Sequence, residues 1–503
     1  MQGLAVILIP AFAGAVAFAV RSDMVRRALV VGTAVAHSVL VLSMWRVPQA
    51  YAAPPSTTAW LAIDGTGLLF LSIVSLLFLM TSYYTVGYLR REHEESHQDL
   101  EESFYFRNAP EAVFTGCLLL FLSAMTLVTQ CQHFGLLWVA VEATTLVSAP
   151  LIYFHRQHRS LEATWKYLLI CSVGIALALL GNFLLAVAAT SAGGGEYVPL
   201  VVGSLIEQAR FLDPTWLKAA FVFLLVGYGT KMGLAPMHTW LPDAHSEAPS
   251  SVSALLSGAL LNCAFLGILR THQVCLAAGY GDFSRPLLIG FGLLSMAVAG
   301  VFIVGQTDFK RMLAYSSVEH MGILALGTGL GGKDGIFGML LHAVNHSVTK
   351  AMLFLIAGNI LAVYRTKQSA TIRGMNRVIP WTTFLWIAGF LAITGSPPFG
   401  VFLSEFTILK AALDQGHAGI AAAYLGLLVL IFVGMATIVL NMSQGERSSS
   451  GEGPAGESFL SESPSMIIPP LLLGGMALGL GVYIPPILSE VLDDAVRALG
   501  GGH

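Results

Sequence analysis

Residues 224–245 read LLVGYGTKMGLAPMHTWLPDAH, an apolar run interrupted by one lysine, Lys231, and then by Gly233 and Pro236. Proline lacks a backbone donor and its ring clashes with the preceding turn, so this segment predicts a helix that breaks partway along its length. In a membrane, backbone groups freed in this way are tolerated only inside protein or beside a cavity. The stretch therefore predicts a membrane helix broken at mid-depth, close to a buried positive charge.

A second segment has the same plan. The apolar run 381–411 contains Gly395, Pro397 and Pro398, and Glu405 follows the break. Similar breaks in corresponding positions of two halves are typical of transporters built from inverted repeats. Two ordinary packing kinks are the alternative, and the charge near each break argues against it.

The composition indicates a membrane protein. Of 503 residues, 55% are hydrophobic and only 11% are charged, whereas soluble domains usually carry about 25% charged residues. A net charge of −3 gives no indication of a nucleic-acid partner. The five cysteines are scattered and form no C-x-x-C pair, which argues against a zinc or iron–sulfur site and favours buried structural thiols.

The apolar runs predict how often the chain crosses the bilayer. A spanning helix needs about 20 mainly apolar residues, and about fourteen such runs are present. The first lacks a preceding basic region, so we expect a retained helix and not a cleaved signal. The predicted spans are 4–20, 28–45, 66–88, 111–130, 134–153, 166–190, 217–240, 251–270, 286–304, 312–330, 336–363, 381–411, 419–442 and 465–488.

The expected fold is an all-α polytopic membrane protein with two inverted five-helix repeats, each with a Pro-broken fourth helix. The halves share no convincing residue-level identity, so the repeat is inferred from the layout of the spans. The predicted domains are 1–110, with the first three transmembrane helices and a charged cytoplasmic loop; 111–270, the first repeat; 286–442, the second repeat; and 443–503, a flexible loop and a C-terminal transmembrane helix.

The distribution of lysine and arginine orients the chain. With the N-terminus outside, the inner loops hold 15 basic residues and the outer side 8, in agreement with the positive-inside rule. Both termini are then predicted on the outer, periplasmic side. The remaining three basic residues, Lys166, Lys231 and Lys350, lie within apolar spans and need a separate explanation.

An ionisable side chain inside a bilayer is costly unless it is paired or hydrated, which makes it a functional candidate. Glu142 lies in the middle of an apolar helix, and Lys231 lies in the first broken helix. If the two are close, they can hold opposite charges or exchange a proton. Lys166, at the start of its span, can pair with either. Buried salt bridges that fix helix packing are the alternative, but a series across many helices favours a conduction path.

A second group of candidates lies in LLHAVNHSVTKAMLFL. His342, His346 and Lys350 recur every four residues and so share one helix face. Histidine titrates near neutral pH, which suits a proton relay. A metal site needs further ligands, and this stretch offers neither a nearby acidic partner nor an H-E-x-x-H motif. We therefore expect no metal here.

Further polar residues flank these runs. In DFKRMLAYSSVEHMGIL, Asp308 lies at the inner boundary, whereas Glu319 and His320 lie further in. His238 follows the first proline break, and Glu405 follows the second. We keep Asp308, Glu319 and His238 as secondary candidates, and we place His320 and Glu405 on the predicted proton path.

Several of these runs resemble one family. KMGLAPMHTWLPDAHSEAP, DFKRMLAYSSVEHMG and the histidine–lysine face before AMLFL resemble the antiporter-like subunits of respiratory complex I and the related Mrp cation/proton antiporters. In detail, WVAVEATTLVSAPLIYFHR followed by SLEATWKYLLICSVGIALALLG is similar to component F of hydrogenase-4 and its relatives. The resemblance covers most of the chain. It implies a core of fourteen helices, two inverted five-helix repeats and a polar axis along the midplane.

The resemblance also implies roles for individual residues. By motif, Glu142 and Lys231 match the family's coupled Glu–Lys pair. The central axis of the second half is matched by His320, His346 and Lys350. Glu405 matches the terminal charge of the second broken helix, where some relatives carry lysine.

One position departs from the family pattern. Relatives often place a lysine or histidine where the eighth span has Asn262, and asparagine carries no charge at neutral pH. Ser257 and water could bridge this point, so it is open whether the first half passes its proton along the same central route. The chain also ends soon after the fourteenth span without a long lateral helix, which favours the shorter type of subunit.

The expected function is that of a proton-translocating membrane subunit of a respiratory complex I-like or membrane-bound hydrogenase complex. The chain offers no cysteine ligation set and no soluble domain, so no cofactor is expected on it. Redox chemistry would belong to partners, namely other membrane subunits and iron–sulfur, hydrogenase-like or quinone-reactive subunits. The resemblance implies the bacterial inner membrane as the location.

Three alternatives remain open at this point. One is an Mrp-type cation/proton antiporter, and another is a proton conduit paired with a non-redox soluble partner. A quinone-binding enzyme is a weaker class, because it would need a quinone site on this chain.

Overall fold

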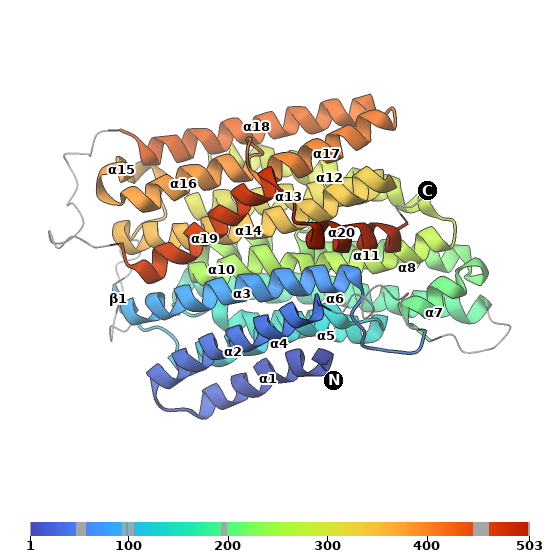
Figure 1. The fold of residues 1–503 in the computed structure, drawn as a ribbon, viewed down its shortest axis with the longest axis horizontal. Coiled ribbons are helices and arrows are strands. Elements are labelled where there is room, and N and C mark those ends of the chain that lie inside the picture. Colours follow the sequence, from blue (N-terminus) through green and yellow to red (C-terminus); the bar gives the residue numbers. More distant parts are fainter. Residues whose placement is uncertain are drawn as a thin grey trace.

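The computed structural model is helical almost throughout. The only sheet in the part of the chain that it describes pairs β1 (His97–Gln98) with β2 (Tyr105–Phe106) in antiparallel fashion. Figure 1 shows the helices lying side by side along the long axis of the molecule, with both termini toward the same end. The described residues are 2–46, 57–92, 97–98, 105–192, 199–445 and 462–500.

In chain order the helices are α1 (Gln2–Ala19), α2 (Asp23–Met44), α3 (Gly65–Arg91), α4 (Glu111–Gln130), α5 (Phe134–Ile152), α6 (His158–Ala192), α7 (Val202–Glu207), η2 (Ala209–Phe211), α8 (Pro214–Met232), α9 (Trp240–Glu247), α10 (Ser250–Leu255), η3 (Leu256–Leu260), α11 (Leu261–Ala277), α12 (Gly281–Ile303), α13 (Phe309–Leu330), α14 (Gly332–Tyr364), η4 (Ser369–Thr371), α15 (Met375–Val378), α16 (Pro380–Ile393), α17 (Gly400–Asp414), α18 (Ala418–Ser443), α19 (Pro464–Val482) and α20 (Pro486–Ala498).

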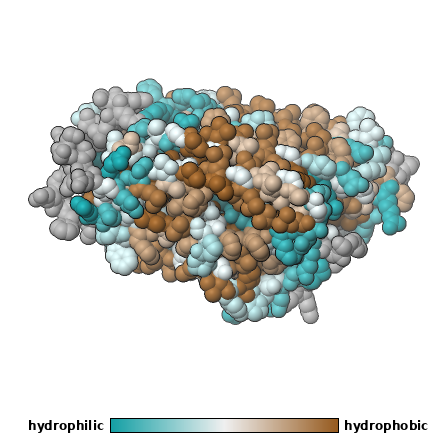
Figure 2. Space-filling model, turned by 90° about the horizontal axis from the view of Figure 1, so that it is seen from above, coloured by the Kyte–Doolittle hydropathy of each residue, from teal (hydrophilic) through white to brown (hydrophobic). Residues whose placement is uncertain are grey.

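The helices confirm a polytopic membrane protein. Within the described residues, 11 helical segments are long and apolar enough to cross a membrane. The broken pairs α8–α9 and α16–α17, together with the buried α13, bring the number of rods to the fourteen predicted from sequence. Figure 2 shows hydrophobic residues gathered over the middle of one face and hydrophilic residues toward both ends, as a bilayer requires.

Glycine allows several of these rods to pack backbone against backbone. A Cβ added to Gly322 of α13 would lie 2.6 Å from the carbonyl oxygen of Gly292 on α12, which is closer than real contacts allow. A Cβ added to Gly227 of α8 would meet the carbonyl oxygen of Gly174 on α6 at 2.7 Å. Small residues at such crossings bring membrane helices together in the absence of a hydrophobic driving force.

The two halves have the same layout. In the range 111–270 the fourth rod is the broken pair α8–α9, and in the range 286–442 it is the broken pair α16–α17. Successive rods alternate in direction, so α4 begins at the end that carries β1 and β2, whereas α12 begins at the opposite end (Figure 1). This arrangement fits the expected inverted repeats, and the domain boundaries stay a prediction.

Some boundaries differ from the predicted spans. α6 begins at His158 and not at residue 166, because its first turns carry charged residues that lower the hydropathy of the run. The last predicted span, 465–488, ends at Val482, and α20 is a separate helix that starts at Pro486, since proline favours a helix start. The predicted flexible loop 443–464 lies largely outside the described residues.

Candidate functional site

The break between α8 and α9 is built around a glycine and satisfied by protein groups. Gly233 ends α8 with a φ of 85°, and a Cβ there would lie 2.4 Å from a side chain of α9, so the position requires glycine. Trp240 Nε1 donates to the freed carbonyl of Thr230 at 2.8 Å, and Ala235 N donates to Ser295 Oγ at 3.0 Å. Protein side chains therefore replace the backbone hydrogen bonds that the break removes.

Lys231 lies on the last turn of α8, fully buried, and hydroxyl groups hold its ammonium. Nζ donates to Tyr167 OH at 2.6 Å and to Thr145 Oγ1 at 2.8 Å. Tyr167 OH in turn lies 2.6 Å from Ser148 Oγ. Because a hydroxyl group both donates and accepts, this cradle can exchange a proton with the lysine without a carboxylate in contact.

Glu142 lies on α5, one turn before Thr145 and on the same helix face. Ser172 Oγ of α6 donates to Glu142 Oε1 at 3.2 Å. The structure places no ion pair between Glu142 and Lys231; Lys231 instead binds the two hydroxyl groups. The two charges expected to act as a pair are therefore linked through Thr145 and α5 and are not in contact.

Lys166 does not pair with Glu142 or Lys231, so this part of the prediction is wrong. Its Nζ pairs with Glu162 Oε1 at 2.6 Å and with Asp243 Oδ2 at 3.0 Å, and its side chain is 44% exposed. Adjacent helical residues point about 100° apart, and the neighbouring Tyr167 takes the inward direction. The Lys166 side chain therefore points away from Lys231 and toward Asp243 of α9.

Lys166 belongs to a charged cavity of about 280 Å³ that is lined by residues of α6, α9 and the start of α13. Asp243 Oδ1 also pairs with Arg311 at 2.9 Å. Ser246 Oγ donates to Asp308 Oδ2 at 2.6 Å, and Asp308 caps α13 by accepting from two backbone N–H groups. This cavity lies beside the first broken helix, and charged and polar side chains line it. We call it the charged mouth.

The second break has the same construction with a carboxylate at its centre. Gly395 has a φ of 64°, and a Cβ there would lie 2.0 Å from Glu405 Oε2, so the carboxylate packs on bare backbone. Asn345 Nδ2 donates to the carbonyl of Gly400 at 2.7 Å, where α17 begins. Glu405 is 6% exposed, and its Oε1 has no hydrogen-bond partner in the structure.

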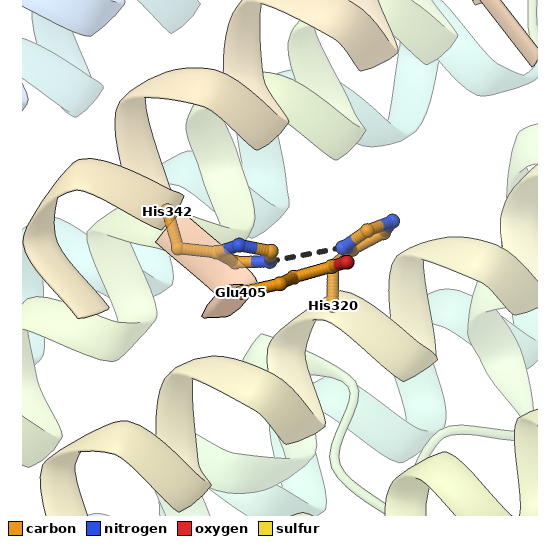
Figure 3. A group of neighbouring side chains, drawn as sticks. All are labelled: His320, His342 and Glu405. Atoms are coloured by element: carbon orange, nitrogen blue, oxygen red, sulfur yellow. Dashed lines mark hydrogen bonds between the residues drawn. The ribbon is translucent and has the colours of Figure 1, made fainter. Parts of the chain in front are cut away.

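Three buried histidines meet beside Glu405. His320 Nδ1 of α13 lies 2.9 Å from His342 Nε2 of α14, and Figure 3 shows Glu405 reaching the same point from α17. The rings of His320 and His346 have centroids 5.1 Å apart. His342 Nδ1 lies 3.0 Å from Ser404 Oγ. The imidazoles therefore form a row of groups that can each accept and release a proton.

Lys350 and Glu319 extend this row. Lys350 Nζ donates to the carbonyl of Leu313 at 2.7 Å, one turn of α14 beyond His346. Glu319 accepts from Ser316 Oγ at 3.3 Å, and its Oε2 lies 4.0 Å from His320 Nε2. Like Lys231, Lys350 is fully buried and is held by an uncharged oxygen.

The two halves meet at η3 and α11, at the position of Asn262. Asn262 Nδ2 donates to Ser347 Oγ of α14 at 2.7 Å, and Ser257 Oγ lies 2.7 Å from Ser317 Oγ of α13. η3 is a single turn of π-helix, a feature that is frequent at functional sites. Uncharged polar groups thus connect the first half to the helices that carry the histidines.

His238, a secondary candidate, and Arg270, which was not a candidate, have different surroundings. His238, behind the first break, is 6% exposed and has only the rings of Phe302 and Tyr315 as described aromatic neighbours, with ring centroids 6.5 and 6.2 Å away. Arg270, one of the eight basic residues counted on the outer side, is fully buried and binds Asp64 through two hydrogen bonds of 2.5 and 2.6 Å. The Arg270–Asp64 pair lies outside the row of proton-exchanging groups.

Residues 131–431 match the family described as NADH:quinone oxidoreductase/Mrp antiporter, TM. The chain belongs to this family. A hydrogenase-4 component F homolog of Methylacidiphilum infernorum (isolate V4) is 35% identical over 437 residues, which cover 87% of this chain and 88% of that protein. An NADH-quinone oxidoreductase subunit N of Desulforudis audaxviator is 28% identical over 374 residues, 72% of each protein.

Two solved structures share the fold. A chain of the Mrp complex from Dietzia sp. superimposes with a TM-score of 0.82 at 19% identity and covers 99% of this chain and 96% of that one. A chain of respiratory complex I from Thermus thermophilus gives a TM-score of 0.80 at 22% identity, with 100% of each chain covered.

Sequence reasoning missed the uncharged members of the site. Tyr167, Thr145 and Ser404 each contact a candidate residue, yet hydroxyl residues are too common in membrane helices to stand out. A weak signal was present for two of them, because Tyr167 follows Lys166 directly and Thr145 lies one helical turn after Glu142. No comparable signal singles out Ser404, which becomes informative only once α14 and α17 are seen to pack together.

Proposed function

We propose that this chain is the proton-translocating membrane subunit of a complex I-like or membrane-bound hydrogenase complex. Its similarity to a hydrogenase-4 component F homolog and to a subunit N of NADH-quinone oxidoreductase supports partners of this class. Electron transfer takes place on iron–sulfur, hydrogenase-like or quinone-reactive partner subunits. This chain contributes the proton path and carries no redox cofactor.

The observation that carries the proposal is the succession of buried ionisable and hydroxyl side chains from α5 to α17. Lys231, His320, His342, His346 and Lys350 are each fully buried, although such groups are costly inside a membrane. They are spaced between the two helix breaks and are held by hydroxyls, carbonyls and one another. Such an arrangement can change its protonation state, whereas a fixed salt bridge resists doing so.

The order of the groups suggests a route. Protons enter at the charged mouth and reach Lys231 through the broken helix α8–α9. The junction of Asn262 with Ser347 leads to α14, and the row from Lys350 and His346 passes the proton toward Glu405. At the junction, proton transfer passes through serine hydroxyls and bound water.

Glu142 sets the protonation of Lys231 from a distance. A negative charge one turn from Thr145 favours the charged lysine, and neutralising that carboxylate lowers the preference. Because Glu142 acts through space and through the Thr145–Tyr167 cradle, it is a positioning charge, and Lys231 is the group that carries the proton.

The basic residues orient the path in the membrane. Arg159, Arg311 and Lys367 line the charged mouth, and all are among the basic residues counted on the side predicted to be cytoplasmic. We therefore place the mouth on the cytoplasmic side of a bacterial inner membrane and both termini on the periplasmic side. Protons leave from the Glu405 side of the second half.

Extraction in a mild detergent, followed by identification of what co-purifies, tests the partner class. Recovery with iron–sulfur and hydrogenase-like or quinone-reactive subunits is the expected result. Recovery alone, or with a soluble partner that binds no redox cofactor, would contradict it.

The likeness to a chain of an Mrp complex keeps a cation/proton antiporter as the second candidate. Flux in membrane vesicles separates the two. A redox complex moves protons when its electron donor is added and does so in the absence of sodium. An antiporter exchanges protons for sodium ions when a sodium gradient is imposed, and it needs no electron donor.

A further inference from the structure

Three side chains from three helices converge at one point in the second half (Figure 3). They are His320 of α13, His342 of α14 and Glu405 of α17, and one nitrogen or oxygen of each lies within 4.8 Å of the others. The exposed fractions are 0%, 0% and 6%. We call this group the His–His–Glu node.

The node contains a polar atom that protein groups leave unsatisfied. Glu405 Oε1 has no hydrogen-bond partner in the structure, whereas His320 Nδ1 and His342 Nε2 lie within hydrogen-bond distance of each other. Buried polar atoms nearly always find partners, so each exception calls for an explanation such as water or an ion. A carboxylate oxygen without a partner, beside two imidazole nitrogens that share one proton, is a donor set that can take up a cation in place of that proton.

We propose that the His–His–Glu node binds a divalent transition-metal ion of the zinc class. Two imidazole nitrogens and one carboxylate oxygen are the donors that zinc takes in open three-ligand sites, with a water as the fourth ligand. Magnesium and calcium prefer oxygen donors alone, so the two histidines select against them.

The distances allow the ion to enter after a small movement. His320 Nδ1 and His342 Nε2 lie 2.9 Å apart, whereas two nitrogens bound to one tetrahedral zinc at about 2.0–2.1 Å lie roughly 3.3 Å apart. The rings must therefore separate by about 0.4 Å, and the proton that they share must leave. Glu405 then closes onto the ion from α17.

A second contact prepares His342 for this role. His342 Nδ1 lies 3.0 Å from Ser404 Oγ, which fixes the ring and leaves Nε2 turned toward the node. Metal-binding histidines usually make such a contact through the nitrogen that does not bind the ion. The stretch around His342 predicts no metal site because it holds no acidic partner; that partner, Glu405, lies on α17, 63 residues further along the chain.

Occupancy has a consequence that rests on the proposed function. An ion held by His320 and His342 takes both facing lone pairs, so neither nitrogen can pass a proton to the other. The metal would then stop proton flux through the second half. The binding site itself does not depend on that proposal.

Cobalt titration of the purified, metal-free complex in detergent tests the site. Co²⁺ in a four-coordinate site of this kind gives intense visible bands, and added Zn²⁺ should remove them by competition. We expect one saturable site whose Kd rises at least about tenfold in His342→Asn and in Glu405→Gln. His37→Asn is the matched control and should leave the Kd unchanged. His37 is also a buried histidine, but it lies outside the node and is hydrogen-bonded to Ser75 and Thr126.

Ser404→Ala guards against loss of folding in the ligand variants. It keeps all three ligands and removes only the contact that orients His342, so the Kd should rise by about tenfold in a folded protein. Equal Kd values in the wild type, His342→Asn and Ser404→Ala, or no four-coordinate cobalt bands in the wild type, would overturn the proposal. Zinc that binds at the node but leaves proton flux unchanged would support the site and contradict the proton route.

Discussion

The two broken helices hold their charges in different ways. In the first half, one lysine, Lys231, is bound by two hydroxyl groups, and the nearest predicted partner charge, Glu142, is not in contact with it. In the second half, His320 and His342 contact each other directly, and Glu405 reaches the same point. The first half therefore keeps a single charge that a distant group can bias, and the second half provides a row along which a proton can move.

The same backbone device serves both arrangements. Each break begins at a glycine with positive φ, Gly233 or Gly395, whose missing Cβ leaves room for a side chain to pack on the backbone. At Gly233 that side chain is apolar, whereas at Gly395 it is the carboxylate of Glu405. Under the proposed function, a shared fold element serves as a switch in one half and as a relay in the other because different residues surround it.

The largest effect is expected at Lys350, in the relay. Replacing it with methionine removes a group that can carry a proton, so proton flux should fall by about 100-fold. Lys410→Met is the matched control, because Lys410 is 52% exposed and pairs with Asp334 outside the path. Flux measured by dye quenching in inverted vesicles checks this, and equal flux in the two variants would remove Lys350 from the relay.

A smaller effect is expected at Glu142, which biases the switch without contacting it. Glu142→Gln removes one charge near Lys231, which should lower flux by about tenfold. Glu142→Asp keeps the charge and should restore most of the flux. A glutamine variant with normal flux and an aspartate variant without it would show that side-chain length, and not charge, is what matters.

A still smaller effect is expected at the junction between switch and relay. Asn262→Leu removes the hydrogen bond to Ser347, worth about 1 kcal/mol, so flux should fall roughly fivefold. Asn182→Leu, which removes a buried asparagine bonded to a backbone carbonyl of α5, is the control. Unchanged flux in Asn262→Leu would mean that the two halves conduct independently.

Replacing Asp64 should not change the number of protons moved per redox turnover, because its buried pair with Arg270 lies outside both the switch and the relay. Asp64→Asn should instead lower the free energy of unfolding by about 3 kcal/mol, because it leaves a buried arginine without its counter-charge. Thermal unfolding in detergent measures this. An altered proton ratio would contradict a purely structural role.

The same pair has a defined pH dependence. Burial alone would raise the pKa of Asp64, but the charge and hydrogen bonds of Arg270 outweigh it and hold that pKa below the ordinary value for aspartate. The contribution to stability is therefore present above the ordinary pKa and is lost as pH falls through the lowered one.

The sequence predicted the rods and the breaks well, for physical reasons. Apolar length and proline mark membrane helices locally, so the spans and the two breaks could be read along the chain. Lys231, His346 and Lys350 were found because a charge in an apolar run is conspicuous. These signals need no knowledge of which helices are neighbours.

Contacts between helices could not be predicted in the same way. Lys166 was assigned inward, yet it faces the charged mouth, because the direction of a residue at the end of a helix depends on its neighbours. Arg270 was counted only as an outer-side charge, and its buried partner Asp64 could not be predicted because Asp64 lies at the start of α3 and Arg270 lies on α11. The Glu405 carboxylate joins two histidines only because α17 packs on α14.

The measurement that tests the account most directly is the number of protons moved per redox turnover in vesicles that contain the Lys231→Met complex. Electron transfer and proton uptake are followed in the same sample, so a slow enzyme cannot pass for an uncoupled one. The account predicts that electron transfer persists while the protons moved per turnover fall, with Lys410→Met equal to the wild type. An unchanged proton ratio in Lys231→Met would contradict the claim that protons pass through this buried lysine.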